Sequence, residues 1–205
     1  NARDRARTGV TNSGKVWVPL MAKHGRYNIV RRVADGGMAE IFLAREGGRG
    51  ASRMLVIKRV LPHIARDPQF VEMFLHEAKV AMHISHPNVC AIYEFGEQDG
   101  TCFIAMEWVN GVSLKHIAKR TSGVGLPPSM AVRITAEVAD ALYAANQARD
   151  QNGRPLNLVH RDVTPENIMV SYDGAVKLLD FGIAKASTQM TQTQAGALKG
   201  KFPYM

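Results

Sequence analysis

The sequence predicts an α+β protein of two lobes, in which strands come first and helices follow. Several short runs between residues 27 and 108 alternate apolar and polar side chains, which is typical of strands. After a Pro-Pro pair at 127–128, apolar residues recur about every four positions, which is typical of a helix packed on one face. The change of period near residues 107–111 therefore predicts the join between the lobes.

The first three strands are expected at about 27–33, 41–44 and 54–60. A Gly-Gly pair separates the first two runs, and glycine is the residue that tight turns favour. Short alternating runs joined by turns predict a small antiparallel sheet.

One helix and two further strands complete the first lobe. Asp67 followed by Pro68 is a good N-cap and first-turn pair. Four apolar residues then recur at about helical spacing: Phe70, Phe74, Ala78 and Met82. Strand character resumes at 89–95 and 101–108 around a polar turn, which gives a five-stranded antiparallel lobe with one helix.

The second lobe is expected to begin with a long helix over residues 129–149. Its apolar stripe consists of Met130, Ile134, Val138, Leu142 and Ala145. We expect a tail at 1–24, disordered and with Met21 as the natural start, then the first lobe at 25–109 and the second, mainly helical and incomplete, at 110–205.

Composition narrows the class of protein. Of 205 residues, 46% are hydrophobic and 21% charged, which is typical of a globular protein. The net charge of +8 is scattered along the chain, which does not favour nucleic-acid binding. Cys90 and Cys102 alone cannot form a disulfide framework or a metal site. No apolar run is long enough to span a membrane, so we expect a cytoplasmic domain, with an anchor elsewhere in a longer protein left open.

Three motifs occur in order. Residues 56–58 read Val-Ile-Lys, residues 160–167 read His-Arg-Asp-Val-Thr-Pro-Glu-Asn, and residues 180–182 read Asp-Phe-Gly. Each recurs by chance, but the ordered set is specific. The chain resembles the protein kinase family over about residues 25–205, and within it the bacterial eukaryotic-like Ser/Thr kinases of myxobacterial style.

The resemblance implies a role for each polar residue of these motifs. Asp162 would orient the substrate hydroxyl and accept its proton, while Asn167 and Asp180 would bind the Mg²⁺ that bridges the phosphates of ATP. Lys58 lies in an apolar strand and needs an anionic partner. By resemblance the partners are phosphate and the carboxylate of Glu77.

The glycine-rich loop departs from the family pattern G-x-G-x-x-G, because residues 34–39 read Ala-Asp-Gly-Gly-Met-Ala. Alanine lacks the positive φ that glycine allows, so we expect a stiffer flap over the phosphates. By itself, Asp-Gly-Gly is more often a plain hairpin turn. By resemblance, Met106 is the gatekeeper beside the adenine, and the following residues contact ATP: Val33, Ala34, Asp35, Gly36, Gly37, Met38, Ala39, Ile41, Val56, Lys58, Met106, Glu107, Val109 and Met169.

Two further departures surround the phosphate site. Thr164 stands where Ser/Thr kinases usually have Lys, and Lys201 stands where they usually have Thr. We hypothesise that the ammonium of Lys201 lies near the γ-phosphate in place of the usual lysine, with Thr164 as its hydrogen-bonding partner. The alternative is a weakened enzyme with an exposed Lys201. In the polar stretch after Asp180, Thr191 and Thr193 are the expected phosphorylation sites.

The resemblance implies ATP-dependent phosphorylation of Ser/Thr hydroxyls on proteins, in bacterial signalling, with Mg²⁺ and Mn²⁺ as candidate metals. A pseudokinase that binds nucleotide and a small-molecule phosphotransferase are the alternatives. Protein substrates are the expected partners, without nucleic acid or membrane in this stretch, and a dimer would allow autophosphorylation. The chain stops before the Pro-Glu motif of the family, so we expect this stretch alone to be inactive.

Overall fold

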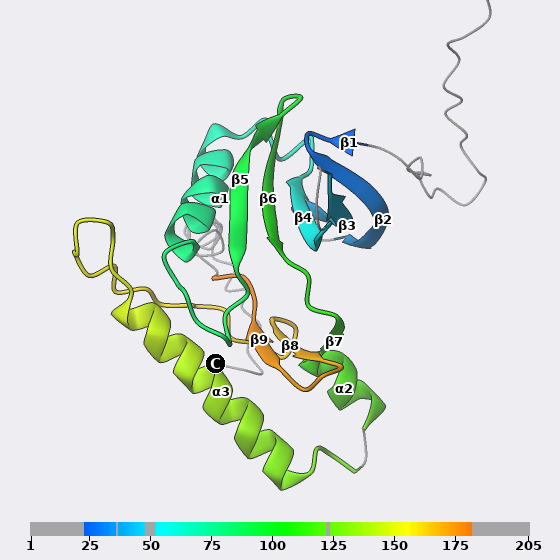
Figure 1. The fold of residues 1–205 in the computed structure, drawn as a ribbon, viewed down its shortest axis with the longest axis vertical. Coiled ribbons are helices and arrows are strands. Elements are labelled where there is room, and N and C mark those ends of the chain that lie inside the picture. Colours follow the sequence, from blue (N-terminus) through cyan, green and yellow to red (C-terminus); the bar gives the residue numbers. More distant parts are fainter. Residues whose placement is uncertain (1–22, 36, 48–51, 122–123, 182–205) are drawn as a thin grey trace, which may run out of the picture.

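The computed structural model describes residues 23–35, 37–47, 52–121 and 124–181, which form an upper and a lower lobe (Figure 1). The upper lobe is a six-stranded antiparallel sheet of order β1-β2-β3-β4-β6-β5. Its strands are β1 (Lys23–His24), β2 (Tyr27–Asp35), β3 (Ala39–Glu46), β4 (Met54–Val60), β5 (Ile92–Gln98) and β6 (Thr101–Glu107).

Five of these strands are those expected from the sequence, and β1 is an addition at the edge. Its two residues pair with Tyr27 and Asn28 across a turn in which Gly25 has φ +57°. His24 is 5% exposed and packs edge-on against Phe103, with ring centroids 4.6 Å apart. The prediction that the tail extends to residue 24 is therefore wrong at its last two residues, because their backbone pairing and this aromatic contact fix them to the sheet.

Helix α1 (Pro68–Ala81) begins as predicted, with the Asp67 side chain accepting hydrogen bonds from the backbone N–H groups of Gln69 and Phe70. The helix packs on the sheet through a cluster of buried side chains: Val60, Phe70, Phe74, Ala78, Cys102 and Ile104. Met82, expected to continue the apolar stripe, is instead the C-cap residue and is exposed. Helix and sheet thus share one apolar layer.

The opposite face of the sheet carries a second buried cluster, which the curled strands enclose (Figure 1). Its members are Tyr27, Ile29, Phe42, Ala44, Leu55, Ile57, Phe103 and Ala105. Because cross-strand partners point to the same face, Ile41, Val56, Lys58 and Met106 all lie on the α1 side.

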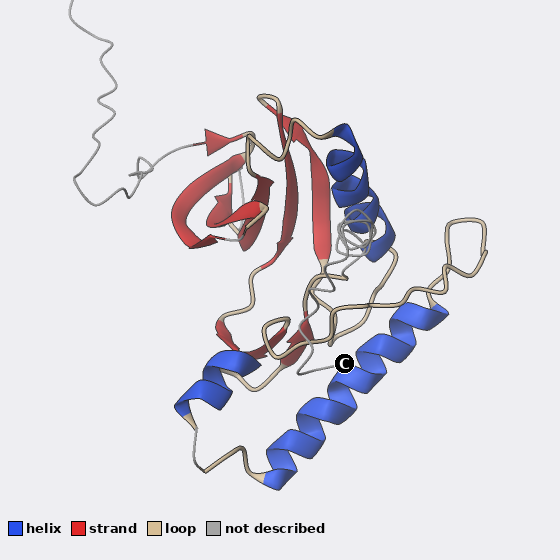
Figure 2. Cartoon of the chain, turned by 180° about the vertical axis from the view of Figure 1, so that it is seen from behind, coloured by secondary structure: helices blue, strands red, loops and turns tan. Residues whose placement is uncertain are grey.

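The lower lobe combines a small sheet with two helices, which lie below the larger sheet in Figure 2. Its sheet has the order β7-β8-β9. The elements are β7 (Gly111–Ser113), α2 (Leu114–Arg120), α3 (Pro128–Gln147), β8 (Ile168–Ser171) and β9 (Val176–Leu178). Helix α2 was not expected, because seven residues are too few to establish a helical period. The Ser113 hydroxyl caps it by accepting a hydrogen bond from His116 N–H.

Helix α3 buries a narrower stripe than the sequence suggested. The buried residues are Ile134, Val138, Ala141 and Ala145, which follow the 3.6-residue period, whereas Leu142 is partly buried. Met130 is 45% exposed, so its assignment to the buried stripe is wrong.

The lobes also meet away from the chain connection at Trp108–Asn110. Segment 88–90 runs beside β9, with Leu178 N–H donating to Asn88 O at 2.8 Å and Cys90 N–H donating to Leu178 O at 3.0 Å. In the lower lobe, Gly111 lets β7 lie close to β8, because a Cβ at Gly111 would lie 2.1 Å from Val170 O. The segment before β5 and the strand before Asp180 are therefore joined by backbone hydrogen bonds.

Two expectations from composition can be compared with the described residues. Cys90 and Cys102 are both buried free thiols; Cys102 lies in β6, and Cys90 lies two residues before β5. Within the described ranges, no helix has the length and apolarity to cross a membrane.

Candidate active site

The catalytic-loop segment 160–167 lies between α3 and β8 and is fixed by a buried histidine. His160 is 2% exposed, and its Nδ1 accepts a hydrogen bond from Asp162 N–H at 3.2 Å. Its Nε2 therefore carries the proton and donates to Leu179 O at 2.8 Å. The neutral imidazole thus links the loop to the residue directly before Asp180.

Asp162 and Asn167 are brought together at the end of this loop. The Asn167 amide Nδ2 donates to Asp162 Oδ2 at 2.6 Å and to Asp162 O at 2.8 Å. The backbone of Asn167 is held on both sides, since its N–H donates to Thr164 O and its carbonyl accepts from Leu179 N–H. The carboxylate of Asp162 consequently has a fixed direction.

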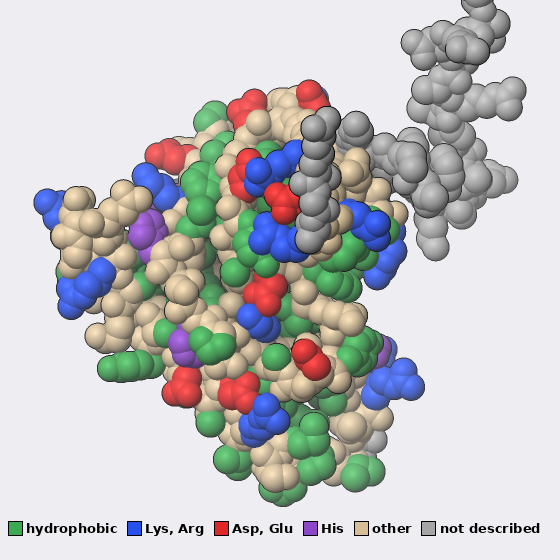
Figure 3. Space-filling model, in the orientation of Figure 1, with side chains coloured by type: hydrophobic (Ala, Val, Ile, Leu, Met, Phe, Trp, Pro, Cys, Tyr) green, Lys and Arg blue, Asp and Glu red, His purple; other side chains and the backbone are tan. Residues whose placement is uncertain are grey.

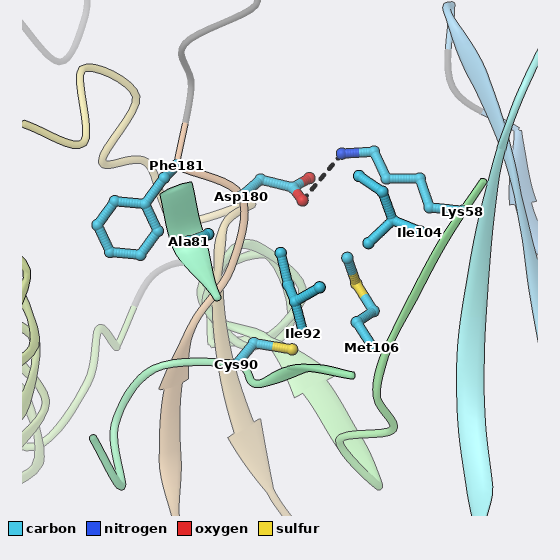
Figure 4. A pocket seen from close by; sticks show the side chains of 8 residues that line it. All are labelled: Lys58, Ala81, Cys90, Ile92, Ile104, Met106, Asp180 and Phe181. Carbon is cyan, nitrogen blue, oxygen red and sulfur yellow. Dashed lines mark ion pairs between the residues drawn. The ribbon is translucent and has the colours of Figure 1, made fainter. Parts of the chain in front are cut away.

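Asp180 faces Lys58 across the space between the lobes. Lys58 Nζ lies 2.9 Å from Asp180 Oδ1, and the two side chains are 18% and 34% exposed (Figure 4). Asp180 has φ +47°, and Arg161 next to Asp162 has φ +61°, a conformation uncommon for residues other than glycine. Left-handed residues thus occur in both motifs, a pattern associated with functional sites.

A small pocket is bordered by Met106 and by the pair of Lys58 and Asp180. It is lined by Lys58, Ala81, Cys90, Ile92, Ile104, Met106, Asp180 and Phe181. Figure 4 shows Lys58 and Asp180 pointing toward one another and the ring of Phe181 directed away from them. That ring is 4% exposed and lies 4.7 Å from the ring of His160, which anchors the start of the Asp-Phe-Gly segment in the lower lobe.

The thiol of Cys90 contributes an apolar surface to this pocket. Burial, followed by the nearby charges of Glu107 and Asp180, raises the pKa of the Cys90 thiol to about 12. The thiol donates a hydrogen bond to Glu107 O at 3.6 Å. At neutral pH it is protonated and a poor nucleophile.

The remaining predicted ATP-site residues lie on several elements around this space. Ile41 on β3 is opposite Lys58, Val56 on β4 is opposite Met106, and Met169 lies on β8 in the lower lobe. Val109 is buried in the connection between the lobes. Of the flap, Ala39 is buried, and Val33, Ala34, Gly37 and Met38 are exposed.

Some predicted residues fall outside what the structure describes. Gly36, Thr191, Thr193 and Lys201 lie outside the described residues. Asp35 has a described backbone in β2, and Glu77 one in α1, but the side chains of both lie outside the description.

Sequence reasoning missed a second lysine, Lys177, and its pairing with Glu107, which was predicted only to contact ATP. Lys177 Nζ lies 2.8 Å from Glu107 Oε1 and 2.9 Å from Oε2, and the same carboxylate accepts a hydrogen bond from Ala91 N–H. The side chains of Lys177 and Glu107 are 17% and 23% exposed. The signal was available, because Lys177 interrupts an apolar strand in the same way as Lys58.

The donor atoms near the cleft fit a hard divalent cation. Asp180 supplies a carboxylate and Asn167 an amide oxygen, and Mg²⁺ in nucleotide enzymes is held by one or two such groups together with phosphate. Within the described ranges, His, Cys, Asp and Glu side chains form no cluster of three or more that could hold a metal. The residues present therefore suit a metal that shares its coordination with a nucleotide.

Comparison with known proteins gives one consistent family. The family model for the protein kinase domain matches residues 27–205. The tyrosine-protein kinase MasK of Myxococcus xanthus is 43% identical over 201 residues, which cover 96% of this chain and 30% of the relative. The Ser/Thr-protein kinases PknB of Mycobacterium leprae and PrkC of Bacillus subtilis are 41% and 35% identical, over 83% and 88% of this chain and 26% of each relative. The chain thus spans about a quarter to a third of these curated relatives.

Solved structures agree on the fold. The PknI kinase domain of Mycobacterium tuberculosis is 32% identical, with a TM-score of 0.65, over 82% of this chain and 64% of that one. The apo form of PpkA-294 gives a TM-score of 0.69 at 20% identity, over 87% and 66% of the two chains, and supports the fold alone. The expected two-lobed fold is confirmed, and the chain belongs to the protein kinase family.

Proposed function

We propose that this domain transfers the terminal phosphoryl group of ATP to Ser and Thr hydroxyls of protein substrates in bacterial signalling. The observation that supports this is the linkage of three chemical groups around one cleft. Asn167 holds the carboxylate of Asp162, the Asn167 backbone bonds to Leu179 next to Asp180, and Asp180 pairs with Lys58. Phosphoryl transfer depends mainly on positioning and on charge neutralisation, for which this set is suited.

Asp162 acts on the acceptor. Its carboxylate accepts a hydrogen bond from the incoming hydroxyl and takes up the proton as the new O–P bond forms. Asn167 keeps this carboxylate in one orientation, and His160 holds the backbone of Asp162. A fixed base lowers the entropic cost of aligning acceptor and phosphate.

Asp180 and Lys58 act on the phosphates. Asp180 and Asn167 would hold Mg²⁺ through oxygen ligands of the kind it prefers, and the metal would supply positive charge that offsets the negative charge of the phosphates. Lys58 offers an ammonium to the phosphate oxygens. Its ion pair with Asp180 keeps both charges compensated at the partly buried mouth of the pocket.

Replacing the proposed base tests the proposal. In the intact protein, Asp162→Asn is expected to lower Mg²⁺-dependent transfer of labelled phosphate to protein by about 10²-fold to 10⁴-fold. Asp140→Asn, at an exposed position on α3, is the matched control and should retain full activity. An Asp162→Asn protein that keeps wild-type turnover, or an intact protein that binds ATP without transferring phosphate, would refute the proposal.

Tyrosine is a second candidate acceptor. The relative MasK, 43% identical to this chain, is named a tyrosine-protein kinase. Thr164 also stands where Ser/Thr kinases usually carry a lysine, so the chain departs from the Ser/Thr pattern two residues after Asp162. Analysis of phosphorylated residues after autophosphorylation distinguishes the two: phosphotyrosine in the active protein but not in Asp162→Asn supports tyrosine as an acceptor, and phosphoserine and phosphothreonine alone exclude it.

Compartment, partners and metal follow from the same proposal. A kinase that draws on the ATP pool is proposed to act in the cytoplasm, with Mg²⁺ as the working metal. A second copy of the chain is the proposed partner for phosphorylation of Thr191 or Thr193. Phosphopeptide mapping of the intact protein, compared with Asp162→Asn, checks those two sites.

A further inference from the structure

Helix α2 presents a basic surface beside the catalytic loop. Four of its seven residues can carry positive charge, and all four are exposed: Lys115, His116, Lys119 and Arg120. Positions 115 and 119, like 116 and 120, are four residues apart, so these side chains share one side of the helix. In Figure 3, blue and purple side chains lie at the right edge of the lower lobe, where Figure 1 shows α2.

The start of this helix is attached to the loop that carries Asp162. Lys115 N–H donates to Pro165 O at 2.8 Å, and the Lys115 ammonium forms an ion pair with Glu166. Glu166 directly precedes Asn167, whose amide holds Asp162. Two contacts therefore link the basic side of α2 to the proposed acceptor site: Lys115 with Glu166, and Asn167 with Asp162.

The charges on α2 are not balanced within the helix. It contains no acidic residue, and like charges four residues apart disfavour a helix by about 0.2–0.5 kcal/mol per pair. The nearby Glu166 is matched by Lys115, which leaves Lys119 and Arg120 as excess positive charge. An arrangement that is unfavourable by itself becomes favourable when an anionic segment binds across it.

We propose that the basic surface of α2, formed by Lys115, His116, Lys119 and Arg120, binds acidic residues that flank the acceptor hydroxyl, so that the kinase selects acidic protein segments. This inference rests on the proposed function, because the acceptor must reach Asp162. Lys119 and Arg120 lie roughly 6–8 Å along the helix axis beyond Lys115. An extended peptide advances about 3.3 Å per residue, so a segment that runs along α2 can place a second carboxylate about two residues from the first.

A peptide fits this surface better than a nucleic acid does. Binding to a nucleic-acid backbone uses a stripe of cations that follows many phosphates. Here the basic residues outside α2 are interleaved with carboxylates, as in the pairs of Arg26 with Glu46, Arg32 with Glu40 and Arg53 with Glu46. A short basic surface beside a catalytic loop matches two or three carboxylates of one polypeptide segment.

The test measures kcat/KM of the intact protein, with Mg²⁺ and ATP, for phosphorylation of different acceptor peptides. In each of two sets, three otherwise identical peptides carry alanine, glutamate or arginine on one flank of the acceptor, the N-terminal flank in one set and the C-terminal flank in the other. We expect kcat/KM to be about fivefold to tenfold higher with glutamate than with alanine on one flank, mainly through KM, and lowest with arginine. The preference should shrink at high ionic strength, because exposed charges are screened.

Charge reversal on α2 tests whether this helix causes the preference for glutamate. The variant Lys119→Glu with Arg120→Glu should lose the preference for glutamate and keep its activity on the alanine peptide within about twofold. The variant Arg45→Glu with Arg66→Glu makes the same change in net charge at exposed positions away from α2 and should keep the preference. Exchanging the two residues, as Lys119→Arg with Arg120→Lys, should also keep it.

The remaining outcomes contradict either the inference about α2 or the proposed function. Equal kcat/KM for the three peptides, or a glutamate preference that survives charge reversal on α2, overturns the inference. So does a charge-reversed protein that loses binding to single-stranded RNA or anionic vesicles while its peptide preference is unchanged. Failure of the wild type to phosphorylate any peptide or protein contradicts the proposed function instead.

Discussion

The side chain of Thr164 is 6% exposed, and its hydroxyl makes no hydrogen bond within the described part of the chain. Leaving a buried hydroxyl unsatisfied costs about 1–3 kcal/mol. The hypothesis that Lys201 supplies its partner fits this observation, although Lys201 itself lies outside the described residues. Family members usually carry Lys and Thr at the two positions, so an exchange of residue types would preserve a cation and a hydroxyl near the phosphate.

Thr164→Val is expected to lower kcat by about tenfold, the effect of losing one charge-assisted hydrogen bond of roughly 1.4 kcal/mol, with little change in Tm. Lys201→Ala should give a similar loss, and the double variant should be no worse than either one. Steady-state kinetics and thermal unfolding of the intact protein provide the measurement. Thr135→Val on α3 is the control, since its hydroxyl bonds only to Ala131 O. Losses that multiply in the double variant would contradict the pairing.

His24 provides a pH dependence of stability. Burial, and then the charge of Arg59, lower the pKa of His24 from its ordinary value. Near neutral pH the imidazole is uncharged in both the folded and the unfolded chain and contributes nothing. As the pH falls through about 6.5, the unfolded chain takes up the proton first, so the free energy of unfolding decreases.

We therefore expect the intact protein to lose stability between pH 7 and pH 5, and His24→Leu to lose less over the same range. Urea unfolding at both pH values measures this difference. His63→Leu is the control, because His63 is exposed and its replacement should leave the slope unchanged. Identical slopes for His24→Leu and the wild type would rule out His24 as the source.

At the scale of elements, one carboxylate joins three strands next to the flap. Glu40 on β3 lies 2.6 Å from Arg32 on β2 and 2.8 Å from Arg59 on β4, and its side chain is 17% exposed. The guanidinium of Arg59 also lies 4.7 Å from the ring centroid of Phe42. Since β2 and β3 are the two strands that border residues 36–38, this cluster fixes their spacing at the base of the flap.

Glu40→Gln is expected to destabilise the domain by about 1–3 kcal/mol, because it removes the charge that two partly buried guanidinium groups share. A less rigid flap should also raise KM for ATP by about threefold to tenfold with a smaller effect on kcat. Glu46→Gln is a close control, since Glu46 ends the same strand and pairs with Arg26 and Arg53 at a more exposed site. Equal effects of the two substitutions on KM would mean that the flap does not depend on Glu40.

At the scale of the whole molecule, two ion pairs join the lobes. The pair of Lys58 and Asp180 joins β4 to the residue that follows Leu179, and the pair of Glu107 and Lys177 joins the end of β6 to β9. Strand β9 leads directly into Leu179 and Asp180, so the second pair fixes the strand that carries the proposed metal ligand. In these two pairs, side chains 70 or more residues apart in sequence help to fix the relative position of the two lobes.

The coupling between Glu107 and Lys177 is expected to be about 1–3 kcal/mol in a double-mutant cycle of Glu107→Gln and Lys177→Met. Chemical denaturation of the four proteins gives the unfolding free energies for the cycle. A matched cycle on Lys115 and Glu166, whose side chains are 63% and 39% exposed, should give less than about 1 kcal/mol. A coupling below that value for Glu107 and Lys177 would show that this pair does not hold the lobes together.

Local sequence was enough to predict much of this protein. The ordered motifs around Lys58, Asp162 and Asp180 predicted the family by resemblance, because each motif is a short local pattern that can be found in the sequence alone. The N-cap at Asp67 and the strand runs predicted α1 and five strands, because caps and side-chain period act over a few residues. Those features depend only on neighbours along the chain.

Tertiary structure decided the rest. Pairing of Lys177 with Glu107 and the attachment of α2 to the catalytic loop join residues distant in sequence. The hydroxyl of Thr164 is buried without a hydrogen-bonding partner in the part of the chain that the structure describes. The exposure of Met130 and the ordering of His24 likewise depend on which surfaces meet in the folded chain. Long-range contacts arise from packing, which sequence period and short motifs do not encode. The sequence therefore determined which chemistry this domain carries, and the fold determined which side chains hold it in position.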